Sequence, residues 1–279
     1  MNLIGRLLTF LVYSNFWIGL GAGLITWETY IIHDYPIDYE VIGFVFFATI
    51  LTYTFQRSVK LLNQSRTQNA RLRWMRRNDL LVKAILILST VACIRHAFYF
   101  TFEVYVLLVG CGFLSLFYIV KIPGKLGKNL RDIPSLKIFL IATVWSATAT
   151  LIPYLNLQNH VGEFPWLLFT ANFLFIIALT IPFDIRDLHL DEPEKKTIPQ
   201  LVGERRSVQI AVVLLIVYWP LLCLLTGLIL YASLLGVCLS IILVNGAKKA
   251  SNDFYFSFVI DGLLILLPLL FWMDHFYLS

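Results

Sequence analysis

Three aspartates follow a long apolar stretch near the middle of the chain, at a spacing that suits a shared divalent ion. On a continuing helix, Asp184, Asp187 and Asp191 lie within an arc of about 60°, whereas Arg186 points to nearly the opposite side. Like charges on one stripe repel each other and disfavour the helix, so a positive group is expected to offset them. Mg²⁺ shared with diphosphate oxygens does so, because Mg²⁺ takes one or two carboxylates and completes its shell with phosphate and water. The alternative is a solvated acidic helix end balanced by nearby basic residues.

Nine apolar stretches must position these residues, and each is near the length of about 20 residues that a membrane-spanning helix needs. The stretches are continuous rather than alternating, which indicates helices and not strands. They cover residues 7–27, 39–56, 80–97, 99–120, 134–155, 164–183, 208–227, 229–246 and 254–272. The sequence therefore predicts an all-α integral membrane protein of nine transmembrane helices, with residues 1–279 forming a single transmembrane domain.

The basic residues predict the orientation of these helices. All but one of the 22 Lys and Arg residues lie in the N-terminus or in every second connection, and the exception is Arg95. Lys and Arg near span ends are retained on the cytoplasmic side during insertion. We therefore expect a multi-pass protein of the cell inner membrane, with a cytoplasmic N-terminus and the C-terminus on the opposite side. The intervening connections carry acidic residues, among them Glu28 and Glu40.

The composition excludes several other classes of protein. Hydrophobic residues make up 59% of the chain and the mean hydropathy is +0.78, which is more apolar surface than one soluble core can bury. The net charge of +5 lies in short loops and indicates contact with anionic membrane lipids rather than nucleic acid. The four cysteines are scattered through apolar stretches and indicate neither a metal site nor a disulfide framework.

The aspartate cluster and the segment after it resemble a motif of the UbiA family of intramembrane prenyltransferases. Residues 196–203 read Lys-Thr-Ile-Pro-Gln-Leu-Val-Gly, similar to the Thr-Leu-Pro-x-x-Leu-Gly segment that follows the second aspartate motif of that family. The motif stands after the sixth of nine stretches, as it does in the family. Tyr118-x-x-Lys121, after the fourth stretch, resembles the family's Tyr followed by Lys or Arg.

This resemblance implies a helical bundle enclosing a cavity open to the cytoplasm and to lipid. There Mg²⁺ on two aspartate motifs holds a polyprenyl diphosphate, which ionises to an allylic cation that attacks an acceptor. In this chain Asp184, Asp187 and Asp191 would bind the Mg²⁺–diphosphate. Lys121 would hold diphosphate oxygens, and Tyr118 would orient a phosphate or the leaving group. No residue is assigned as nucleophile or base, since the acceptor is unknown.

The family's first motif, Asn-Asp-x-x-Asp-x-x-x-Asp, is lost from this chain. Residues 53–61 read Tyr-Thr-Phe-Gln-Arg-Ser-Val-Lys-Leu, so Arg57 replaces the central aspartate and shares a helical face with Tyr53 and Lys60. In one reading Arg57 and Lys60 bind phosphate directly, because the guanidinium fork matches two phosphate oxygens. In the other, Arg57 pairs with Asp184 or Asp187 and neutralises it.

A further acidic residue, Asp261, lies inside the last apolar stretch. Burying an ionisable group in lipid costs at least about 2.5 kcal/mol, so we expect Asp261 to take part in substrate binding and to face a basic partner. The alternative is a structural bond between helices.

Two functions remain open on the sequence. The first is transfer or rearrangement of an isoprenoid diphosphate, with a polyprenyl diphosphate or other lipid as substrate and Mg²⁺ as cofactor. The second is a catalytically inactive UbiA-like protein that serves in lipid binding, in transport or as a partner subunit, which the lost motif favours.

Overall fold

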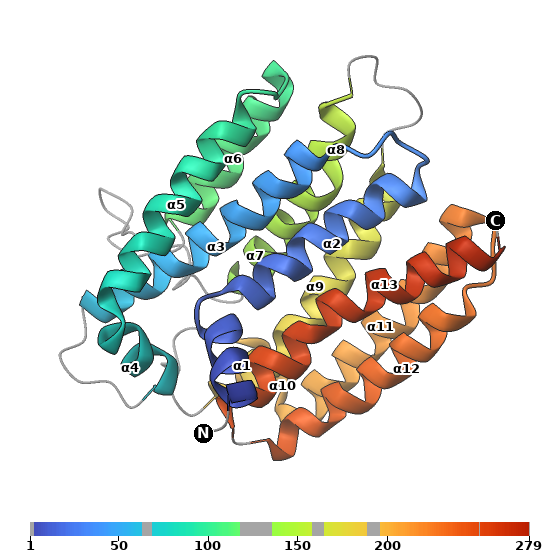
Figure 1. Cartoon of the computed structure of the whole chain (residues 1–279). Helices are drawn as coiled ribbons and strands as arrows, with labels where there is room; N and C mark the ends of the chain where they lie inside the picture. The colour runs from blue at the N-terminus through green and yellow to red at the C-terminus, as the bar shows by residue number, and fades with distance from the viewer. Residues whose placement is uncertain are drawn as a thin grey trace.

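The computed structural model is a bundle of roughly aligned helices (Figure 1). The structure describes residues 3–62, 69–117, 136–157, 165–188, 196–250 and 252–278. These ranges contain helices and turns but no strand, so the prediction of an all-α protein is confirmed.

Most of the predicted spans form helices that are long and apolar enough to cross a membrane. Seven meet this description in the described ranges: α3 (Tyr39–Leu62), α5 (Asp79–Ala97), α7 continued by η2 and α8 (Leu136–Leu155), α9 (Trp166–Arg186), α11 (Glu204–Thr226), α12 continued by η4 (Tyr231–Lys249) and η5 continued by α13 (Tyr255–Leu278). Two further apolar helices, α1 (Leu3–Tyr13) and α2 (Phe16–Ile32), form a bent pair that counts as an eighth candidate if the two together make one span. The apolar helix α6 (Phe102–Phe117) is shorter, so the ninth crossing stays a prediction.

The first predicted span is not one straight helix, because α1 and α2 meet at an angle of 63°. The break falls at Asn15, whose φ of 70° lies in the left-handed region that asparagine tolerates better than most residues. The Asn15 side-chain amide donates to the hydroxyl of Thr54 at 2.9 Å, which fixes the corner against α3. A consequence is that Glu28, expected in an outer connection, lies inside α2 with 1% of its surface exposed.

The core of the bundle lies between central helices. Helix α9 packs between α7 and α11, and α2 packs between α3 and α13. The approach of α2 to α13 is close at Gly21, where an added Cβ would lie 2.6 Å from the Cβ of Leu264. Small residues allow such close contacts between membrane helices. By contrast, α5 and α6 expose large apolar side chains, among them Ile87, Leu88 and Phe113, which suits contact with lipid.

One end of the bundle carries exposed basic side chains, among them Arg73, Arg76 and Arg77, and we call it the basic end. Figure 1 shows α1, α4 (Ala70–Arg77) and α10 (Ile198–Val202) at this end, whereas the C-terminus lies at the other. Helix α4 is amphipathic, because Leu72 and Met75 are buried while Arg73, Arg76 and Arg77 are exposed. Asn69 caps this helix by accepting a hydrogen bond from the Leu72 amide at 3.1 Å.

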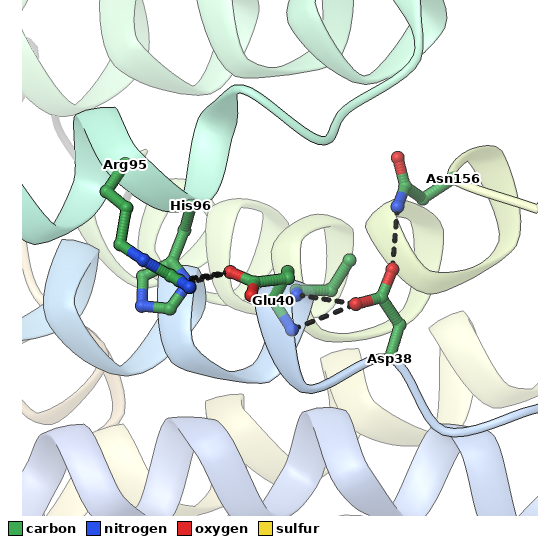
Figure 2. A network of polar contacts seen from close by, with 6 residues as sticks. Asp38, Glu40, Arg95, His96 and Asn156 are labelled. Atoms are coloured by element: carbon green, nitrogen blue, oxygen red, sulfur yellow. Dashed lines mark hydrogen bonds and ion pairs between the residues drawn. The ribbon is translucent and has the colours of Figure 1, made fainter.

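A polar network at the opposite end accounts for the exceptional position of Arg95 (Figure 2). The Glu40 carboxylate, at the start of α3, contacts Arg95 and His96 at the end of α5, each at 2.5 Å. The side-chain amide of Asn156 donates to Asp38 at 2.9 Å, which joins the segment before α3 to the end of α8. Arg95 therefore serves to hold α5 against α3.

Candidate functional site

Helix α3 brings Arg57 to the basic end in a partly buried position. Its guanidinium carbon lies 5.3 Å from the ring centre of Tyr53, so the predicted shared face of these two residues is confirmed. The Nη1 atom of Arg57 is buried and has no hydrogen-bond partner among the described residues. The same face of α3 carries Lys60, which is exposed.

A second arginine, Arg71 of α4, lies near enough for its charge to act on Arg57 and was not predicted. It is 7% exposed, and its guanidinium lies 5.4 Å from the ring centre of Tyr13. Its buried Nε atom has no hydrogen-bond partner in the described part of the chain. The charges of Arg57 and Arg71 are close enough to repel each other. Burial lowers the pKa of Arg71, which reflects the cost of keeping this cation away from water.

Asp261 completes this arginine-rich environment from α13. It is 8% exposed and directly follows the π-helix η5 (Tyr255–Ile260). The positive charges of Arg57, Arg71 and Arg186 all act on its carboxylate. No hydrogen bond or close ion pair joins Asp261 to the described residues. The three arginines act on Asp261 at a distance, and its role in substrate binding stays a prediction.

Asp184 has a cationic partner other than the predicted one. Lys137 of α7 contacts its carboxylate at 2.5 Å, and the two side chains are only 12% and 2% exposed. The alternative in which Arg57 neutralises an aspartate is therefore wrong for Asp184. The reason is geometric: α7 packs directly on α9 and delivers Lys137 to the last turn of α9.

Asp187 is neutralised by its own neighbour in the sequence. Helix α9 ends at Arg186, so Asp187 is its C-cap and is not part of a continuing helical stripe. Arg186 donates to both carboxylate oxygens of Asp187, at 2.8 and 3.0 Å, and also donates to Asp253 at 2.7 Å. The prediction that Arg186 points away from the aspartates is therefore wrong, because it assumed an unbroken helix.

The charge state of Asp187 follows from these contacts. Burial is the largest single effect and opposes ionisation of the carboxyl. The hydrogen bonds from Arg186, together with the positive charges of Arg186, Lys137 and Lys60, outweigh it and hold the pKa of Asp187 below its ordinary value. Asp187 is thus an ionised, fully paired carboxylate.

The described carboxylates do not fit a shared magnesium ion. Within the described ranges, no group of three or more His, Cys, Asp or Glu side chains is placed to hold a metal ion. Asp184 and Asp187 each contact a cationic side chain instead. The remaining predicted site residues, Asp191, Tyr118 and Lys121, lie outside the described residues.

A separate polar cluster lies deeper in the bundle, around the π-helix η2 (Ala147–Leu151). The Asn172 amide donates to the hydroxyl of Thr150 at 3.0 Å, and Thr29 of α2 donates to the carbonyl of Ala149 at 2.9 Å. Glu28, next to Thr29, has a buried carboxylate oxygen without a partner among the described residues. Apolar periodicity gave no signal for this cluster, because its members come from three separate helices, α2, η2 and α9.

Comparison with known proteins supports the fold. No protein-family model and no curated protein matches the sequence. Two solved structures are similar to it. A digeranylgeranylglyceryl phosphate synthase has a TM-score of 0.57 at 16% identity, covering 98% of this chain and 99% of that one. A UbiA homolog from Archaeoglobus fulgidus bound to DMAPP and Mg²⁺ has a TM-score of 0.48 at 14% identity, covering 96% and 94%. The first likeness extends over nearly the whole chain, and the protein therefore has a UbiA-like membrane fold.

Proposed function

We propose that the protein is prenyltransferase-like and binds an isoprenoid diphosphate, with the anionic head at the basic end and the hydrocarbon chain among the helices. The observation that carries the proposal is the pair of arginines, Arg57 and Arg71. Arg71 is buried and Arg57 partly buried, and both have a buried N–H without a partner among the described residues. The charge of Arg71 repels Arg57, and the carboxylates that act on both arginines, Asp253 and Asp261, do so at a distance. A buried donor left without a partner costs about 1–3 kcal/mol, and more when it is charged.

An anion between the two guanidiniums removes both costs. Diphosphate oxygens accept the spare hydrogen bonds, and their charge offsets the repulsion between the arginines. The planar fork of arginine favours phosphate over a simple halide, because it can engage two oxygens at once. The same groups would stabilise the charge that grows on diphosphate as its bond to the prenyl carbon breaks.

The other predicted residues take supporting roles in this proposal. Lys60 adds positive charge on the same face of α3, and Asp261 orients the arginines through its charge. Tyr118 and Lys121 are proposed to contact the diphosphate from the segment after α6. We place the site in a cavity open to the cytoplasm, where the lipid-facing helices keep water from the reactive carbon.

A second function has a specific observation in its favour. The ion pairs Lys137–Asp184 and Arg186–Asp187 occupy the carboxylates that the family resemblance assigns to activation of the diphosphate. A protein that binds a prenyl lipid without reacting it would show this arrangement. A Mg²⁺ site would need Asp191 and the opening of both pairs.

The proposal is tested by ligand binding to the purified protein in detergent. Geranylgeranyl diphosphate is compared by calorimetry with geranylgeraniol, which has the same chain but no charge. We expect the diphosphate to bind and the alcohol to bind at least tenfold more weakly. Arg57→Gln should weaken diphosphate binding by about 10- to 100-fold, the equivalent of one lost charged hydrogen bond.

The matched control is Arg73→Gln, because Arg73 is an exposed arginine of α4. Its affinity should equal that of the wild type. Equal affinity for the alcohol and the diphosphate, or an unchanged affinity in Arg57→Gln, would remove the proposed site. Release of pyrophosphate on addition of a membrane lipid extract would identify a transferase, and bound diphosphate that stays intact would identify the non-catalytic relative.

A further inference from the structure

We infer that the diphosphate is bound without a magnesium ion, its charge being offset by Arg57 and Arg71. This inference rests on the proposed function and concerns the same site. It also departs from the cofactor that the aspartate motif predicts.

The carboxylates of Asp184 and Asp187 are already engaged by cationic side chains. Asp184 and Lys137 form a pair that is nearly excluded from water, at 2.5 Å. Removing one partner of a buried ion pair is strongly destabilising, because it leaves a charge uncompensated away from water. A metal that took Asp184 as a ligand would either displace Lys137 or stand beside its positive charge. Both alternatives weaken metal binding.

Asp187 is also a poor metal ligand, because its carboxylate is bound by Arg186. Both of its oxygens accept hydrogen bonds from Arg186, which also binds Asp253 and lies 5.2 Å from the ring centre of Phe183. Arg186 is thus held on three sides, and it cannot leave Asp187 without breaking contacts to two other residues. A carboxylate with both oxygens engaged has little left to offer a hard cation.

Positive charge without a carboxylate partner among the described residues is present at two arginines. The chain has Arg57 at the central position of the lost aspartate motif, and α4 places Arg71 beside it. Neither guanidinium makes a hydrogen bond or ion pair within the described ranges, and each stacks on a tyrosine ring. Fixed cations with spare donors therefore stand on one side of the site, while the carboxylates opposite are already neutralised.

Arg71 is the better of the two arginines to test, because it is more buried than Arg57. It is also not the capping residue of α4, which is Asn69. Arg71→Gln should weaken geranylgeranyl diphosphate binding at least tenfold. Arg71→Lys should recover only part of the affinity, since an ammonium keeps the charge but loses the fork. Arg73→Gln is again the control on the same helix. Each variant must keep the elution profile and the melting temperature of the wild type, so that a loss of affinity is not caused by misfolding.

The metal is tested by titrating geranylgeranyl diphosphate into wild-type protein in excess EDTA and, separately, in excess Mg²⁺. We expect the two dissociation constants to agree within about threefold. Mn²⁺ added to the ligand-free protein should keep the electron paramagnetic resonance signal of the free ion. Binding that vanishes in EDTA and returns with Mg²⁺ would overturn the inference and leave the proposed function standing. Absence of binding in both buffers would overturn the proposed function itself.

Discussion

The side chains at the basic end divide into those that are paired and those that are not. Lys137 and Arg186 have carboxylate partners within 2.8 Å, whereas Arg57 and Arg71 contact only tyrosine rings in the part of the chain that the structure describes. A buried cation is stable when an anion is near, so the unpaired arginines define where an anionic ligand is needed.

The buried pair Lys137–Asp184 gives a prediction for stability. Lys137→Met leaves Asp184 buried without its partner, and we expect a loss of about 3–5 kcal/mol. Changing both residues, in Lys137→Met with Asp184→Leu, should restore most of the lost stability, because no charge then stays buried. Melting temperatures of the detergent-solubilised variants measure this. Losses that simply add in the double variant would show that the two residues do not interact.

The ionised Asp187 gives a prediction for pH. A carboxyl whose folded pKa is depressed contributes stability above its unfolded pKa of about 3.9, and this contribution is lost as the pH falls through the folded value. Asp187→Asn should therefore melt below the wild type at pH 7, and the gap should shrink as the pH falls below about 4. A gap that stays constant across this range would contradict the pairing with Arg186.

At the level of single residues, the sequence located only part of the site. Arg57 was found because it stands where a motif would place an aspartate. Arg71 was missed because it belongs to a run of arginines that membrane retention explains equally well. Which arginine turns inward is decided by the packing of α4, where Leu72 and Met75 are buried and carry Arg71 with them.

The packing of whole helices depends on a few small residues. At Gly21 an added Cβ would approach the Cβ of Leu264, which cannot move without moving α13. We expect Gly21→Val to destabilise the protein by about 1–3 kcal/mol, as overpacking does. Gly112→Val in α6 is the matched control, since an added Cβ there meets nothing within 4 Å. Equal melting temperatures for the two variants would contradict the close α2–α13 packing.

The helices themselves were predictable because their apolar stretches are long and continuous. Two breaks in the helices could not be predicted from the sequence. The corner at Asn15 contains neither proline nor glycine, and it is fixed by a hydrogen bond to Thr54 that lies far away in the sequence. The end of α9 at Arg186 was hidden because polar residues continue the helical spacing beyond it. The corner at Asn15 depends on this tertiary contact as well as on the tolerance of asparagine for a positive φ.

The molecule as a whole has an orientation that can be measured. The alternation of basic connections predicts an odd number of crossings, with the N-terminus in the cytoplasm and the C-terminus outside. Alkaline phosphatase fused after Ser279 should be active, and green fluorescent protein fused there should be dark. The opposite result would indicate an even number of crossings. The short helix α6 would then be the first candidate for an element that does not span.

The position of the diphosphate can be seen in a structure of the protein with geranylgeranyl thiodiphosphate, solved in EDTA. We expect diphosphate density between the guanidiniums of Arg57 and Arg71, with both within hydrogen-bond distance of its oxygens and with Lys137 still bound to Asp184. Density for the diphosphate at another place, or Lys137 and Arg186 turned away from their aspartates around a metal ion, would contradict it.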